Sequence, residues 1–131
     1  MKQRIGENLL ATKSGSTAYI PDRGDIVWLS FDPQAGHEQM KRRPAIIISP
    51  MVYNAAKFRL ALVCPITHAI KGYPFEVLLP KGMQIKGAIL SDQLKSLDWE
   101  AREADFIEKV PQLSLKPLLQ EVSSKVKTLL P

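Results

Sequence analysis

The sequence lacks the residues on which several common kinds of protein site depend. Cys64 is its one cysteine, so the chain by itself forms neither an internal disulfide nor a cysteine-rich metal site. Its two histidines, His37 and His68, lie on separate segments, and it has no zinc-spaced cluster, glycine-rich nucleotide loop or serine elbow. We therefore expect neither a metal nor a cofactor.

Long apolar runs are missing as well. No stretch approaches the roughly 20 apolar residues that a membrane span needs. The first residues hold only Leu9, Leu10 and Ala11, where a signal peptide would carry at least about seven apolar residues. A lone cysteine agrees with a reducing compartment. These absences predict a cytoplasmic protein that does not enter the membrane.

Internal repeats, low-complexity segments and the helices that connect parallel strands are also absent, which argues against a parallel α/β sheet. The sequence instead contains short segments, rich in β-branched and aromatic residues, between turn residues. We expect a short helical turn or loop over 51–58. The strands that we expect cover residues 25–32, 45–49, 59–67, 75–79 and 87–91, the last continuing at 94–97. The pattern predicts a fold that is mainly β, a small antiparallel sheet curled into a barrel.

A different pattern marks the last part of the chain. Ser114 is a suitable helix N-cap, and Pro117 would then fall in the first turn, where proline is tolerated. We expect one amphipathic helix whose apolar stripe closes one side of the barrel. The apolar residues at helical spacing are Leu115, Leu118, Leu119, Val122, Val126, Leu129 and Leu130.

Size and charge limit the organisation and the partners. The chain has 131 residues, 45% of them hydrophobic, which fits a single domain over 19–131 preceded by a flexible arm over 1–18. The formal net charge is +5, and residues 23–97 carry ten basic and five acidic side chains, while the flanking segments nearly balance. A basic excess in the strand-rich middle fits a surface for a polyanion, with an ordinary solvated surface as the alternative.

The segment between the first two predicted strands concentrates groups that can do chemistry. Residues 32–43 hold one histidine, one glutamate and three basic side chains, and prolines at both ends limit how this loop moves. In a small barrel, strand ends and loops on one rim converge. The groups that would then surround a phosphate come from this loop and from the ends of later strands: His37, Glu38, Arg43, Thr67 and Asp92.

Several short motifs follow one another in order: Gly24-Asp25-Ile26-Val27-Trp28, Phe31-Asp32-Pro33, Gly36-His37-Glu38-Gln39, Arg43-Pro44-Ala45, Pro65-Ile66-Thr67, Lys71-Gly72-Tyr73-Pro74-Phe75-Glu76-Val77 and Asp92-Gln93-Leu94-Lys95-Ser96. Together they resemble the MazF/PemK (Kid) toxins of bacterial toxin–antitoxin pairs over about residues 19–130, closest to the chromosomal MazF type. The resemblance implies an SH3-like (CcdB/PemK-like) barrel with a C-terminal helix, a homodimer, and a metal-independent endoribonuclease that cuts single-stranded RNA at short sequences. It also implies an acidic, partly disordered, MazE-like antitoxin that lies over the RNA groove, and DNA binding by the complex.

The resemblance also implies roles for single residues. The positions that match Arg43 and Thr67 are those most often assigned to catalysis, and an always-charged guanidinium fork with a hydroxyl suits a phosphate oxyanion. For proton transfer, Glu38 and His37 both remain candidates. Kid-type toxins are thought to use a histidine and an aspartate that match His37 and Asp92, with an arginine two positions before the aspartate. This chain has Leu90 at the position of that arginine, so we keep Asp92 as a residue of the RNA groove and not as the base.

Around this site we expect an RNA-binding surface in which cations hold phosphates and aromatic rings stack on bases. Trp28 and Phe31 are expected in the core or in a dimer contact, and Trp99 in the core or in a stacking platform. The residues expected to bind RNA are Lys41, Arg42, Lys57, Arg59, His68, Lys71, Tyr73, Phe75, Asp92, Gln93 and Lys95.

Two other classes of protein share part of this pattern. A gyrase-poisoning toxin of the CcdB type would share the barrel and the helix, but this chain ends in Thr128-Leu129-Leu130-Pro131, without the Trp-Gly-Ile signature of that type. A non-catalytic SH3-like nucleic-acid-binding module would need the basic surface but not the pairing of Arg43 with Thr67.

Overall fold

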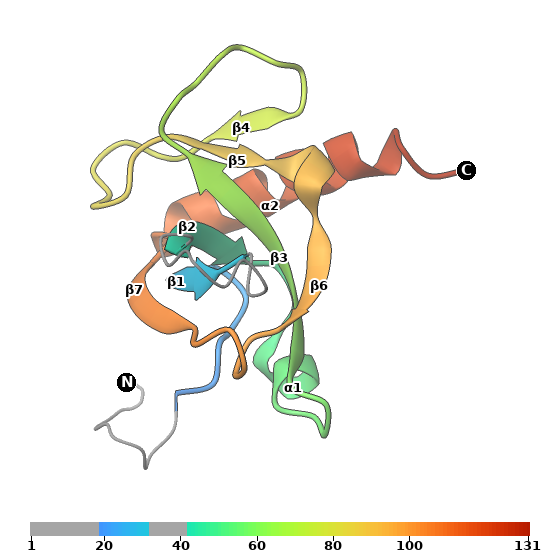
Figure 1. Cartoon of the computed structure of the whole chain (residues 1–131). Helices are drawn as coiled ribbons and strands as arrows, with labels where there is room; N and C mark the ends of the chain where they lie inside the picture. Colours follow the sequence, from blue (N-terminus) through green and yellow to red (C-terminus); the bar gives the residue numbers. More distant parts are fainter. Residues whose placement is uncertain (1–18, 32–41) are drawn as a thin grey trace.

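The structure, a computed structural model, describes residues 19–31 and 42–131. Figure 1 labels the elements along the chain. In order, they are β1 (Asp25–Ser30), β2 (Arg42–Ile47), α1 (Met51–Asn54), β3 (Leu60–Thr67), β4 (Glu76–Leu78), β5 (Ala88–Leu90), the 3-10 turn η3 (Ser91–Gln93), β6 (Lys95–Asp98), β7 (Asp105–Lys109) and α2 (Gln112–Lys127). Within these residues, no helix combines the length and the apolar character that crossing a bilayer would require.

Within the described part of the chain, seven strands form one curved sheet with the order β4-β5-β3-β2-β1-β7, and β6 pairs with β3. Every pairing is antiparallel, and β3 is central because it pairs with β2, β5 and β6. A side chain links the two ends of this order: the Glu108 carboxylate on β7 accepts the backbone N–H groups of Gln84 and Ile85, between β4 and β5, at 3.0 and 2.7 Å. The predicted class, mainly β with a C-terminal helix, is confirmed.

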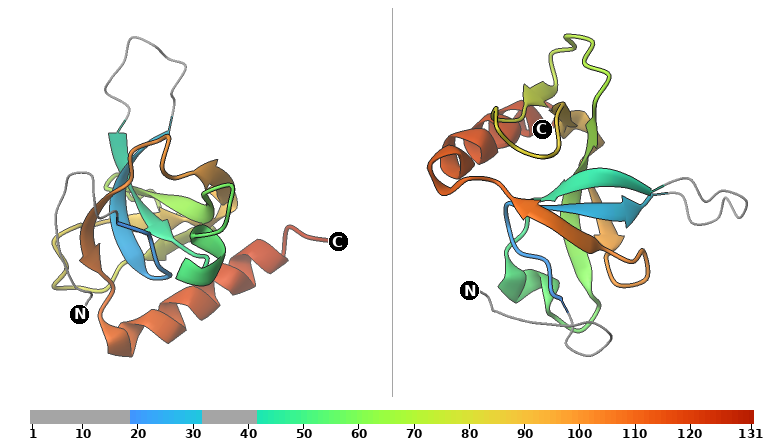
Figure 2. Two further views of the ribbon diagram at one scale, coloured as in Figure 1. Left: turned by 90° about the horizontal axis from the view of Figure 1, so that it is seen from below. Right: turned by 90° about the vertical axis from the view of Figure 1, so that its left-hand side faces the viewer.

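Two apolar clusters lie on the two faces of the sheet, because successive strand residues point to opposite sides. On one face, Leu118 and Val122 of α2 pack with Ile26 and Ile46; Figure 2 shows α2 lying across this side. On the other face, a second cluster contains Val27, Leu29, Ala45, Ile47, Ala61, Val63, Leu97 and Trp99. We call it the second-face cluster. Strand β1 thus contributes apolar residues to both clusters, Ile26 to the first and Val27 and Leu29 to the second.

The C-terminal helix differs from the prediction in its ends. It begins at Gln112, after Pro111, so the predicted N-cap at Ser114 is wrong and Pro117 lies inside the helix instead of in its first turn. Leu129 and Leu130 follow the last helical residue and are exposed, so they do not extend the apolar stripe. The helix is still held by its buried face, which gives most of a helix's stability in a protein.

Three strand predictions also need correction. Strand β2 starts at Arg42, before the predicted residue 45, because Arg42 and Arg43 pair with Ser30 and Leu29 of β1. Strand β6 is separate from β5, since the turn η3 divides them. Strand β7, at Asp105–Lys109, was not predicted, because its charged residues hide the alternation of an edge strand.

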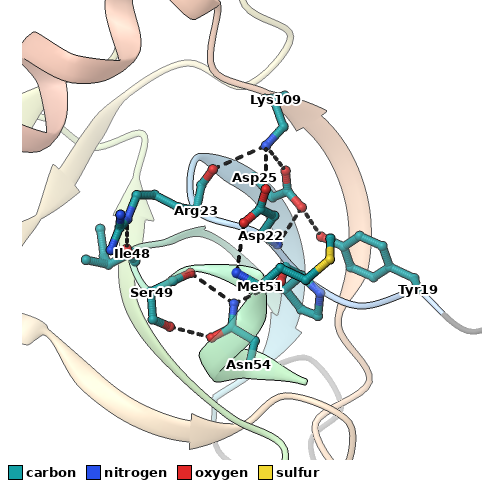
Figure 3. A network of polar contacts seen from close by, with 10 residues as sticks. Tyr19, Asp22, Arg23, Asp25, Ile48, Ser49, Met51, Asn54 and Lys109 are labelled. Carbon is teal, nitrogen blue, oxygen red and sulfur yellow. Dashed lines mark hydrogen bonds and ion pairs between the residues drawn. The ribbon is translucent and has the colours of Figure 1, made fainter. Parts of the chain in front are cut away.

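A polar network fixes the start of β1 (Figure 3). Asp25 is only 3% exposed, and its carboxylate lies 2.7 Å from the Lys109 ammonium of β7 while accepting the Tyr19 hydroxyl at 2.6 Å. Burial and the negative charge of Asp25 raise the pKa of Tyr19 well above its usual value. The buried Asn54 amide donates to the carbonyls of Pro21 and Ser49 at 2.8 and 2.9 Å, which ties α1 to the same region. The expected arm over 1–18 lies outside the described residues.

Candidate active site

The register of β2 and β3 relates Arg43 to Thr67. Ala45 pairs with Pro65, the last pair of this ladder, and the next residue of β2, Pro44, has no N–H to donate to β3. Arg43 lies two residues before Ala45 in β2, and Thr67 lies two residues after Pro65 in β3, so a continuation of the same register would bring these two positions opposite each other. Since alternate residues share a face, both side chains belong to the face that carries Ala45 and the second-face cluster.

The hydroxyl of Thr67 is oriented by a local turn. The N–H of Ala69 donates to Thr67 Oγ1 at 3.1 Å, so the oxygen acts as an acceptor and the hydroxyl hydrogen can be given to another group. The backbone of Thr67 pairs with Ala88 of β5. Next to it, Gly87 has φ +134°, and a Cβ on Gly87 would overlap the carbonyl oxygen of Thr67. Thr67 is therefore held by the turn that follows it and by strand β5.

Arg43 and Lys95 share one aromatic neighbour. The guanidinium carbon of Arg43 and the ammonium nitrogen of Lys95 each lie over the ring of Phe31, 5.8 Å from its centroid. The strand register places Arg43 beside Leu29 and Lys95 beside Val63, two members of the second-face cluster. Two cations from different strands thus gather at the end of this face.

Arg42, the neighbour of Arg43 in β2, is turned the other way. Its guanidinium donates to the Asp105 carboxylate at 2.9 Å, the Glu103 carbonyl at 2.8 Å and the Ser30 hydroxyl at 3.3 Å. These bonds join β2 to β1 and β7. The structure therefore does not bring Arg42 together with Arg43, and its contacts are those of a residue that holds strands together.

The loop between β3 and β4 carries several of the expected RNA-binding residues and is tied down by side chains. The Glu76 carboxylate accepts the N–H groups of Lys71 and Gly72, at 3.1 and 2.8 Å. From α2, the Lys125 ammonium donates to the carbonyl of Pro74 at 2.6 Å. Tyr73 is 59% exposed, with the Lys71 ammonium 6.0 Å from its ring centroid. The loop thus presents a cation and an aromatic ring on a fixed backbone.

Four further predicted residues lie beside these elements. His68 directly follows Thr67 and is exposed, and Phe75 is half-buried before β4. Asp92 and Gln93 are exposed in the turn η3, just before Lys95 of β6. Burial raises the pKa of the Cys64 thiol to about 12, and the negative charge of Asp92 contributes.

Lys57 and Arg59 precede Leu60, the first residue of β3, whereas Thr67 is its last residue. Eight strand residues span roughly 25 Å, so within one chain these two cations are not part of the same site. The Arg59 side chain instead pairs with Glu100 at 3.6 Å and lies over the ring of Trp99. Trp99 is 5% exposed and donates from its indole nitrogen to the carbonyl of Asn54, so it belongs to the core and the stacking role is wrong.

The predicted residues His37, Glu38 and Lys41 lie outside the described residues. Within 19–31 and 42–131, no group of three or more histidine, cysteine, aspartate or glutamate side chains is arranged to hold a metal ion. Sequence reasoning missed Glu76 and Lys125 as supports of the β3–β4 loop. The role of Glu76 could have been predicted, because it is an acidic residue at the end of a basic loop. The role of Lys125 could not, because Lys125 is far from this loop in the sequence.

Comparison with protein families supplies an independent observation. Residues 22–130 match the family described as PemK-like, MazF-like toxins of type II toxin–antitoxin systems. The endoribonuclease toxin MazF of Escherichia coli strain K12 is 49% identical over 86 residues, which cover 66% of this chain and 76% of that protein. The endoribonuclease PemK of Escherichia coli is 34% identical over 107 residues, covering 79% of this chain and 80% of that protein.

Solved structures agree with this result. A crystal structure of a MazE–MazF complex from Deinococcus radiodurans matches with a TM-score of 0.76 and 46% identity, covering 86% of this chain and 97% of the matched chain. A crystal structure of MazF from the same organism matches with a TM-score of 0.74 and 46% identity, covering 86% and 98%. The likeness therefore extends over almost the whole of the matched chains.

Proposed function

Because the chain belongs to the PemK-like, MazF-like toxins of type II toxin–antitoxin systems, we propose that this endoribonuclease toxin cuts single-stranded RNA without a metal, through Arg43 and Thr67. The endoribonuclease activity and the antitoxin partnership follow from the family and from its solved complexes. The mechanism is our proposal. The observation that supports it is the β2–β3 register, which pairs Ala45 with Pro65 and, if continued by two residues, would bring Arg43 and Thr67 opposite each other on one face.

Cleavage without a metal uses the ribose 2′-hydroxyl as the nucleophile. Its oxygen forms a bond to the adjacent phosphorus, the bond from phosphorus to the 5′-oxygen breaks, and the products carry a 2′,3′-cyclic phosphate and a 5′-hydroxyl. The proton of the 2′-hydroxyl must be accepted, and the leaving 5′-oxygen must receive one. The negative charge on the phosphoryl oxygens must be stabilised in between.

Arg43 fits the stabilising role because its fork donates two parallel hydrogen bonds to phosphate oxygens and stays charged at any relevant pH. Thr67 adds a third donor. Its oxygen already accepts the N–H of Ala69, so the hydroxyl hydrogen is directed elsewhere, and a phosphate oxygen facing Arg43 would receive it. For the proton transfer, Glu38 and His37 remain the candidates.

Substrate binding is proposed along the surface next to this pair. Lys95, beside Arg43, and Lys71, on the β3–β4 loop, would hold phosphates, while Tyr73 would stack on a base. The other members of this surface are His68, Phe75, Asp92 and Gln93. We leave Lys57, Arg59 and Arg42 out of it, because the structure places them elsewhere or commits them to other contacts.

The partners that we propose are a second copy of this chain and an acidic MazE-like antitoxin. The support for the antitoxin is the MazE–MazF complexes that this chain resembles, together with its net charge of +5. The support for a dimer contact is the 39% exposure of Trp28, a large apolar side chain at the surface of β1. We further propose that the single-stranded RNA it cuts is messenger RNA, and therefore that the protein acts in the cytoplasm.

The test is a cleavage assay on labelled single-stranded RNA in excess chelator. The wild-type protein should cut at defined sequences, and Arg43→Ala should lower kcat by about a hundredfold or more, as the loss of an oxyanion donor does. Thr67→Val should lower kcat by at least about tenfold, while Lys81→Ala, in the exposed turn after β4, serves as the control. Dependence on magnesium would contradict the mechanism. RNA binding without cleavage, or gyrase inhibition, would favour the alternative classes.

A further inference from the structure

Phe31 lies under the charged groups of two residues of the proposed site, Arg43 and Lys95. It follows the end of β1 and packs on the second-face cluster with a half-buried side chain. Arg43 of β2 and Lys95 of β6 both place their charged groups over its ring at 5.8 Å from the centroid. One ring therefore contacts two cations that come from different strands.

The backbone of Phe31 is also fixed. The guanidinium of Arg102 donates to the carbonyls of Ser30 and Phe31, each at 3.1 Å, and the backbone N–H of Ser30 donates to the carbonyl of Arg102 at 3.2 Å. The segment after β6 thus clamps the end of β1 from outside. A ring on a clamped backbone, packed against a core, is a rigid reference point for the side chains that contact it.

An aromatic ring positions a cation in a way that a carboxylate does not. The negative face of the ring attracts the cation but carries no net charge, so it leaves the full positive charge for a phosphate. A carboxylate partner would neutralise part of that charge and would compete with the phosphate for the same hydrogen-bond donors. Holding donors in place before the reaction lowers the barrier without reorganisation at the moment of reaction.

We propose that Phe31 is a positioning residue for RNA cleavage, whose ring aligns the Arg43 guanidinium and the Lys95 ammonium toward one phosphate. The inference rests on the proposed function, since it assumes that Arg43 acts on the scissile phosphate. It assigns Phe31 a role through its ring electrons, beyond core or dimer packing. Arg43 and Lys95, and not Phe31, are the groups that touch the substrate.

The experiment replaces Phe31 in the full-length protein by pentafluorophenylalanine, which keeps a ring of similar shape but removes its negative face, and by tyrosine, which keeps that face. Phe31→Leu adds a variant without a ring. We expect pentafluorophenylalanine and leucine to lower kcat by about fivefold or more with KM within about twofold, and tyrosine to stay near wild type. In an Arg43→Ala background, the leucine change should cost much less than in the wild-type protein, because its effect acts largely through Arg43.

A second readout does not depend on activity. The side-chain protons of Arg43 should show ring-current shifts in NMR spectra, retained in Phe31→Tyr and lost in Phe31→Leu. Equal kcat for the phenylalanine and pentafluorophenylalanine proteins, or a change in KM alone, would overturn the positioning role and indicate packing or base contact instead. If Arg43→Ala still loses activity in that case, the proposed function stands while the role of Phe31 falls. If the wild-type protein cuts no RNA, both fail.

Discussion

Arg42 and Arg43 are neighbours in strand β2 and serve opposite faces of the sheet. Arg42 donates to Asp105 of β7, while Arg43 lies over the ring of Phe31 beside the second-face cluster. Alternation along a strand sends adjacent side chains to opposite sides, so one arginine joins strands and the other faces the proposed phosphate. Two residues of the same type and the same local sequence thus receive different roles from the register alone.

The first prediction separates these two arginines. Arg42→Ala should lower the free energy of unfolding by about 1 to 2 kcal/mol, since it loses a surface ion pair and several hydrogen bonds, and should keep most of the activity. Arg43→Ala should do the reverse, with a large loss of kcat and a small change in stability. Urea denaturation and steady-state kinetics on the same two variants check this. Equal losses of kcat would show that both arginines act on the substrate.

The second prediction concerns Gly87 and the placement of Thr67. A Cβ at Gly87 would overlap the Thr67 carbonyl oxygen at a φ of +134°, so Gly87→Ala should destabilise the fold by about 2 kcal/mol or more and reduce kcat. Gly82→Ala is the matched control: Gly82 also has a positive φ, +91°, but its Cβ would meet no atom within 4 Å. Both alanine variants place a side chain at a positive φ, but only Gly87→Ala adds an overlap with another atom. The difference between their free energies of unfolding, measured by denaturant melts, therefore gives the cost of that overlap. A Gly87→Ala protein as stable as the control would refute the close approach.

The third prediction concerns the β3–β4 loop. Glu76→Ala removes the acceptor for the N–H groups of Lys71 and Gly72, so Lys71 and Tyr73 should lose their fixed position. We expect KM for a short RNA to rise by about fivefold, with kcat changed less, because binding and not the chemical step depends on this loop. Glu121→Ala, on the exposed side of α2, controls for the loss of one negative charge. An unchanged KM would show that RNA does not use the loop.

The fourth prediction concerns Cys64 and alkaline pH. Its pKa is raised to about 12 from an ordinary value near 9, so the folded protein keeps a proton that the unfolded chain loses between these values. The unfolded state then binds fewer protons, and stability should fall as pH rises from about 9 toward 12. At pH 8 to 9, iodoacetamide should modify Cys64 only after denaturation. Fast labelling of the native protein would contradict its burial.

The strands and the helix could be predicted from the sequence largely because their apolar residues keep a regular period. Strand β3 and the buried face of α2 are examples. Strand β7 was not predicted because its charged residues Asp105, Glu108 and Lys109 interrupt the apolar pattern. They make tertiary contacts instead: Glu108 accepts backbone N–H groups between β4 and β5, and Lys109 pairs with Asp25. A residue recruited by a distant partner does not follow the local pattern.

For the site, motifs could propose Arg43 and Thr67, but the sequence could not show that the basic residues Lys57 and Arg59 lie away from them within the chain. They precede the strand that ends in Thr67, and the length of β3 carries the two ends of that strand far apart. The contact of Phe31 with two cations and the bond from Lys125 to Pro74 depend on chain segments that meet only after folding. Local sequence patterns do not predict such tertiary contacts.

The central claim is that the RNA supplies its own nucleophile while Arg43 and Thr67 stabilise the charge, and the end groups of the product test it most directly. A substrate with a single 2′-deoxy residue on the 5′ side of the cut should resist cleavage, and the normal RNA, cut in excess chelator, should yield a 2′,3′-cyclic phosphate and a 5′-hydroxyl. Cleavage of the deoxy-substituted substrate, or products with a 5′-phosphate, would contradict the account.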